Sequence, residues 1–225
     1  MNDLTVRRLT GICGVLVGAG GVLTVPLYFL YPGPPPVWDV LTRNLVTIIV
    51  CMCMIVFLAG FRHLIRLSGP DHDWLAGLIY GTGLIYTAVI LVGVSLEAGA
   101  VIGQPGTAID PTTDGPLANG DILIHGSIGR ALTVVTLTAA GYAVLRTRAL
   151  PAWIGRTAYL IAAANLACVP SLYFGNNAAQ FYSALGWGNT ALAASLIAYW
   201  TMAVGIVLLR RARSATTPLP TQAAQ

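Results

Sequence analysis

Long apolar stretches separated by short polar segments run along the whole chain. Six stretches are long enough to cross a bilayer, which takes roughly 20 predominantly apolar residues per helix. They cover about residues 9–30, 45–65, 74–96, 122–145, 152–174 and 188–209. Apolar residues do not alternate with polar ones in them, and lipid cannot satisfy an open strand, so each stretch predicts a helix. The pattern predicts an all-α fold, a single bundle of six transmembrane helices over residues 1–213, with a disordered tail over 214–225.

The composition agrees with a membrane protein and narrows its chemistry. Of the 225 residues, 56% are hydrophobic and 9% are charged, against about a quarter charged in ordinary soluble domains. The chain is too apolar for intrinsic disorder. All 12 basic residues are arginines. The absence of lysine excludes a Schiff base to retinal or pyridoxal phosphate, and it also excludes a P-loop.

The placement of the arginines predicts the orientation of the helices, because cytoplasmic loops accumulate basic residues. Ten of them fall on one side of the predicted topology: Arg7, Arg8, Arg62, Arg66, Arg146, Arg148, Arg156, Arg210, Arg211 and Arg213. The opposite side holds only Arg43, in a loop, and Arg130 lies within a span. We therefore expect a multi-pass plasma-membrane protein with both termini in the cytoplasm. The net charge of +4 is then a signal of topology rather than of nucleic-acid binding.

Four glycines of the first span lie on one face of the predicted helix. They are Gly11, Gly14, Gly18 and Gly21. Small residues let helix backbones approach closely in lipid. Packing within the chain is the favoured interpretation, and a homo- or hetero-oligomer through this stripe is the alternative.

An ionisable side chain inside a transmembrane span costs free energy on insertion into the bilayer. Each such residue is therefore treated first as a candidate functional residue. Arg130 lies nine residues after Asp121, roughly 14 Å along a helix and thus in the outer half of the bilayer. Glu97 lies near the outer end of its span, at a depth compatible with an ion pair to Arg130. Asn165 falls in the outer half as well.

Helical phase groups these residues further. Asp121 and His125 are four residues apart and share a face, and Tyr86 shares a face with Glu97. We expect a polar pocket open to the outer leaflet under the loop 98–121, with Arg130 and Asn165 as its floor. The rim is expected to hold Glu97, Asp121, His125 and Asn176.

Sequence motifs of familiar membrane enzymes are missing. The chain has no H-E-x-x-H zinc helix, no G-x-S-x-G elbow, no spaced histidine boxes and no repeated Asp-rich motif. The short polar run Asp71-His72-Asp73 is weak evidence for a metal. No metal and no cofactor are therefore expected.

Three stretches carry a family resemblance. They are RALPAWIG at 148–155, VPSLYFG at 169–175 and LGWG at 185–188. In these stretches the chain resembles uncharacterised actinobacterial six-helix integral membrane proteins of a domain-of-unknown-function group. The resemblance covers about the last three spans. It implies the topology and an actinobacterial source, and it assigns no functional residue.

Three function classes stay open. The slightly favoured one is a non-enzymatic accessory or lipid-binding subunit that binds a lipid-soluble small molecule in the outer pocket, without nucleic acid. The alternative is an acid–base enzyme of cyclase, isomerase or hydrolase type acting on an isoprenoid-like substrate. Its catalytic residues would be Glu97 as acid or base, Arg130 as anion stabiliser and His125 as proton shuttle. Small-molecule export is a further alternative. The Glu97–Arg130 pair could also be a purely structural link between two helices.

Overall fold

The computed structural model describes residues 2–103, 106–115 and 117–214, and this part of the chain is helical with no strand. The first three spans are α1 (Asp3–Leu27), α2 (Val37–Arg66) and α3 (Asp73–Gly103), the last preceded by the short η1 (Pro70–His72). Six helical segments are long and apolar enough to cross a membrane. The predicted all-α fold with six apolar spans is therefore confirmed.

The last three spans are composite helices. The fourth joins α4 (Ala118–Leu123), the π-helical turn η2 (Ile124–Ile128) and α5 (Gly129–Thr147). The fifth joins α6 (Ala152–Cys168) and η3 (Val169–Tyr173), and the sixth joins the π-helical turn η4 (Gly188–Ala193) and α7 (Ala194–Ser214). Ser214 thus ends a helix, and the rest of the tail predicted over 214–225 lies outside the described residues.

Two helices extend beyond the predicted spans at the end opposite the termini. α2 begins at Val37, directly after Pro36, rather than near residue 45. α3 continues to Gly103 rather than ending near residue 96. Both extensions contain polar residues that interrupt the apolar pattern, which is why hydropathy alone placed them in loops. Asp39, Arg43 and Asn44 are thereby inside a helix, and all three are buried.

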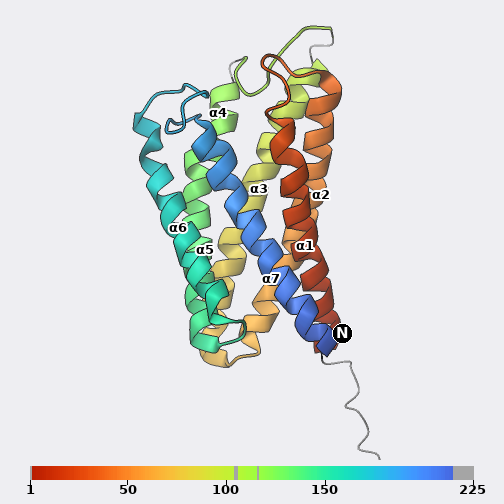
Figure 1. The fold of residues 1–225 in the computed structure, drawn as a ribbon, viewed down its shortest axis with the longest axis vertical. Coiled ribbons are helices and arrows are strands. Elements are labelled where there is room, and N and C mark those ends of the chain that lie inside the picture. Colours follow the sequence, from red (N-terminus) through yellow and green to blue (C-terminus); the bar gives the residue numbers. More distant parts are fainter. Residues whose placement is uncertain (1, 104–105, 116, 215–225) are drawn as a thin grey trace, which may run out of the picture.

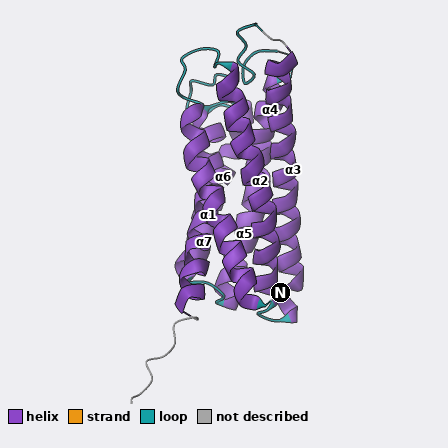
Figure 2. Cartoon of the chain, turned by 90° about the vertical axis from the view of Figure 1, so that its right-hand side faces the viewer, coloured by secondary structure: helices purple, strands orange, loops and turns teal. Residues whose placement is uncertain are grey.

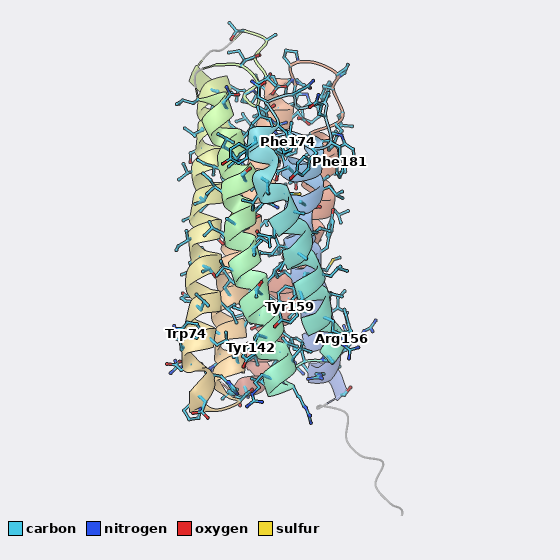
Figure 3. The ribbon with its side chains drawn as sticks, turned by 90° about the vertical axis from the view of Figure 1, so that its left-hand side faces the viewer. Trp74, Tyr142, Arg156, Tyr159, Phe174 and Phe181 are labelled. Carbon is cyan, nitrogen blue, oxygen red and sulfur yellow. The ribbon has the colours of Figure 1, made fainter. Side chains whose placement is uncertain are left out.

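The helices form one elongated bundle in which α1 packs between α2 and α7, α3 lies beside α2 and α5, and α6 covers α5 (Figure 1). The start of α1 and the end of α7 lie at the same end of this bundle. Turning the view by 90° shows the loops gathered at the two ends of the helices (Figure 2). Exposed aromatic side chains lie toward both ends, with Trp74 near the termini and Phe174 and Phe181 at the opposite end (Figure 3). Aromatic residues commonly mark the two membrane–water interfaces.

The glycine stripe of α1 packs against α7 of the same chain. A Cβ added at Gly14 would lie 2.8 Å from the carbonyl oxygen of Thr201, and one added at Gly11 would lie 2.7 Å from Leu209. Gly18 likewise faces Met202. The favoured interpretation of the stripe is therefore confirmed, and an oligomer through it would first have to displace α7.

Candidate functional site

A cavity of about 290 Å³ lies between α1, α2, α3 and α7, in the half of the bundle away from the termini. Small and apolar side chains form most of its walls: Val17 and Gly21 of α1, Val50 and Met54 of α2, and Ala194 and Ala198 of α7. Thr112 from the loop before α4 also lines it. Neither α5 nor α6, both described in full, contributes to the lining.

Serine and threonine hydroxyl groups on the helices of the cavity wall are directed to backbone carbonyls of their own spans. Thr47 donates to the carbonyl of Arg43 at 2.8 Å, and Thr87 donates to the carbonyl of Gly83 at 2.8 Å. Ser195 makes the same kind of bond within its own span. Because these donors are already used, the wall is effectively apolar along most of its length.

Glu97 lines the cavity near the end of α3 that lies away from the termini, and it is only 2% exposed. Tyr28 donates its hydroxyl to Oε1 at 3.2 Å, and Arg43 donates Nε to Oε2 at 3.2 Å. With the Asn44 amide oriented to suit its neighbours, its nitrogen donates to Oε2 at 3.2 Å and its oxygen accepts from the N–H of Ala98 at 3.3 Å. The carboxylate is thus held by donors from three sides, as a buried charge requires.

The partner of Glu97 is Arg43, not Arg130. The guanidinium of Arg43 is buried, lies 4.1 Å from the ring centre of Tyr28, and has Nη1 3.8 Å from Oδ2 of Asp39. The predicted Glu97–Arg130 ion pair is therefore wrong, and so is the placement of Arg43 in an outer loop. Both errors have one cause, because the early start of α2 turns Arg43 into the bundle.

Arg130 has a different environment. It is fully buried and donates to Oδ1 of Asn165 at 3.1 Å and to the carbonyls of His125 at 2.9 Å and Gly126 at 3.3 Å. No carboxylate of the described residues lies within salt-bridge distance of it. Gly126 has a non-helical ψ of −120°, which breaks the helix here. A guanidinium can satisfy the carbonyls that such a break frees.

A second buried polar group fixes the broken helices to one another. Asn189 in η4 donates to the hydroxyl of Ser171 at 2.9 Å and to the carbonyl of Ala184 at 3.2 Å. The hydroxyl of Ser127 in η2 lies 3.4 Å from that of Ser171. These contacts join the fourth, fifth and sixth spans beside the cavity.

His125 brings the fourth span to the cavity. Its ring lines the cavity, while Nδ1 lies 3.1 Å from the carbonyl oxygen of Asp121 and 3.4 Å from Oδ1 of the same residue. Asp121 is 1% exposed. The imidazole packs against Gly93 of α3, where an added Cβ would clash with it and would lie 2.6 Å from Oδ1 of Asp121. Gly93 therefore permits the close approach of the two helices, as small residues do in membranes.

The structure separates the predicted pocket residues into three groups. Tyr86, Glu97 and His125 line the cavity, and Asp121 lies directly behind His125. Arg130 and Asn165 do not line it, so the expected floor is wrong. Asn176 is exposed and lies outside the lining.

Sequence reasoning missed Asp39, Asn44 and the aromatic residues Tyr28 and Trp187, in addition to the role of Arg43. The sequence did contain one sign that α2 begins early: Asp39 and Arg43 have the i, i+4 spacing of an ion pair within a helix. Among the described residues no group of three or more His, Cys, Asp or Glu side chains is arranged to hold a metal ion.

Comparisons with protein-family models, with curated proteins and with solved structures find no match to this chain.

Proposed function

We propose that this protein binds a lipid-soluble small molecule in the cavity between α1, α2, α3 and α7, and that it acts as a lipid-binding or accessory membrane protein. The observation that carries the proposal is a largely apolar cavity whose lining includes Glu97, a buried residue with a hydrogen-bonded carboxylate. Ligand sites are typically apolar cavities of about 300–1,000 Å³ with a few convergent polar groups. An amphiphile would place its tail among the helices and its polar group beside Glu97 and His125.

Binding is favoured over acid–base catalysis by the partners of Glu97. Tyr28, Arg43 and Asn44 all donate to its two oxygens, so few lone pairs are free to take a proton from a substrate. Arg130, the expected stabiliser of negative charge, is occupied by backbone carbonyls away from the cavity lining. The three residues of the enzyme hypothesis therefore do not converge on one reacting centre.

We further propose that both termini face the cytoplasm of a plasma-membrane protein. The ten arginines outside the bundle interior belong to the helix ends and turns at the end that carries the termini, and Arg156 is seen there in Figure 3. The two others, Arg43 and Arg130, are buried, so the asymmetry is stronger than the sequence indicated. A C-terminal green fluorescent protein fusion should fluoresce, and a C-terminal alkaline phosphatase fusion should be inactive. The reverse pattern would contradict this orientation.

The binding proposal is tested by filling the cavity. Ala194 of α7 lines it, whereas Ala164 of α6 is exposed on the outside of the bundle. Ala194→Phe should lower the affinity of the purified protein for radiolabelled decanol by at least about tenfold, which is about 1.4 kcal/mol. Ala164→Phe is the matched control and should bind as the wild type does. Equal binding by both variants, or no saturable binding by the wild type, would contradict the proposal.

A further inference from the structure

We propose that the molecule bound in this cavity carries a cationic head of the ammonium type, held at the end of the cavity near Glu97. The inference rests on the proposed function and specifies the chemistry of its ligand. Three features of the described residues support it: the balance of buried charge, two carboxylates without hydrogen-bond donors, and aromatic rings around the same space.

The buried charges at this end of the bundle do not balance. Three carboxylates, Asp39, Glu97 and Asp121, are all at most 2% exposed. The groups facing them are the guanidinium of Arg43 and the imidazole of His125. Carboxylates outnumber cations even when His125 is protonated. Uncompensated buried charge costs several kcal/mol, so the cluster favours an additional positive charge.

Arg130 does not supply that charge. It is the other buried guanidinium of the described chain, and its donors are directed to Asn165 and to the carbonyls of the helix break. Among the residues that the structure describes, the ion pairs at this end have Arg43 and His125 as their basic partners. The missing cation must therefore come from bound protons or from a ligand.

Asp39 and Asp121 have unused hydrogen-bonding capacity. Neither carboxylate receives a hydrogen bond from any described residue, although both are buried. Buried carboxylates are normally paired or hydrogen-bonded. An ammonium group beside Glu97 and His125 would offset part of their charge through space, without direct contact.

Aromatic rings lie around the same cavity. Tyr28, Phe29, Tyr86 and Trp187 all line it, together with the carboxylate of Glu97. Rings combined with negative charge are the chemistry that recognises quaternary ammonium groups, because the face of a ring attracts a cation. Tyr28 already shows this attraction with Arg43, whose guanidinium carbon lies 4.1 Å from the ring centre. An anionic head would be repelled by the same carboxylates.

Three probes share the same kind of alkyl tail and differ in the charge of the head group. They are decyltrimethylammonium (cationic), decanol (uncharged) and decanoate (anionic). Binding is measured on purified protein in an uncharged maltoside detergent, and the binding that survives in Ala194→Phe is subtracted as partition into the micelle. We expect decyltrimethylammonium to bind at least about tenfold tighter than decanol, and decanoate to bind weakest. The ranking compares the three probes on the wild-type protein, and protein-free micelles give a second measure of partition in case Ala194→Phe does not fold.

A variant tests the role of the carboxylate. Glu97→Gln should reduce the affinity ratio of decyltrimethylammonium over decanol by about tenfold. Asp114→Asn removes an exposed acidic charge from the loop before α4, and it should leave the ratio unchanged. Should Glu97→Gln lose the fold, Asp121→Asn provides the same comparison of ratios.

The outcomes separate this inference from the proposed function. Saturable, Ala194-dependent binding of decanol with no preference for the cation would overturn the cationic head and leave the binding function standing. A preference that persists in every carboxylate variant, or that is lost equally in Asp114→Asn, would also overturn it. Absence of saturable binding for all three probes would overturn the proposed function itself.

Discussion

Removal of Arg43 should destabilise the protein far more than removal of an exposed arginine. Arg43→Met takes the Nε donor and the nearby Nη2 from Glu97 and leaves that carboxylate at 2% exposure. Breaking a buried ion pair from one side costs about 3–5 kcal/mol. Tyr28 and Asn44 continue to donate to Glu97, which places the expected cost at the lower end. For a chain of this length, 3 kcal/mol corresponds to a fall in Tm of about 6–12 °C.

The assay is thermal unfolding of purified protein in one detergent, followed by loss of the monodisperse peak in size-exclusion chromatography. Arg66→Met is the matched control, because Arg66 pairs with Asp73 at 2.6 Å but both side chains are more than half exposed. Exposed pairs contribute about 0–1 kcal/mol, so its Tm should fall by less than about 4 °C. Adding Glu97→Gln to Arg43→Met should recover at least half of the loss. Equal effects of the two arginine variants, or no recovery in the double variant, would refute the buried pairing.

Two further predictions concern the helix contacts. Gly93→Ala should lower both Tm and decyltrimethylammonium affinity because the new methyl group meets His125, whereas Gly99→Ala on the same helix has open space and should change neither by much. Arg130→Leu should leave the carbonyls of the helix break without donors, at a cost of about 2–6 kcal/mol, seen as a lower yield of monodisperse protein.

The number of spans and the helix faces were predictable for a simple reason. A bilayer imposes a minimum apolar length on each helix, so six long runs could only be six helices. Helical phase then placed Tyr86 and Glu97 on one face, and both line the cavity. The glycine spacing of α1 similarly predicted a close contact, which α7 provides.

The pairing of the arginines was not predictable from hydropathy. A polar turn that is buried inside a helix has the same composition as a polar loop, so Asp39, Arg43 and Asn44 resembled a connector after the prolines. Arg130 was misplaced for another reason. Its depth followed from the rise per residue, but depth does not fix the direction of a side chain, and the break at Gly126 provides carbonyls to which Arg130 donates instead.

The two buried arginines act at different places, Arg43 on the carboxylate of Glu97 and Arg130 on the carbonyls at the break in the fourth span. Arg130 satisfies the carbonyls that the break frees, and the break lies in the turn that carries His125 against Gly93 of α3. His125 then forms part of the cavity wall and Asp121 is buried behind it, within reach of the electrostatic field of Glu97 and Arg43. Loss of Arg130 should therefore alter the cavity without any contact to a ligand, whereas loss of Arg43 acts on the carboxylate itself. A cationic ligand that protects Arg43→Met from thermal unfolding more than it protects Arg130→Leu would identify the Glu97 end as the place where the head group binds, because the head group would replace the positive charge lost beside Glu97.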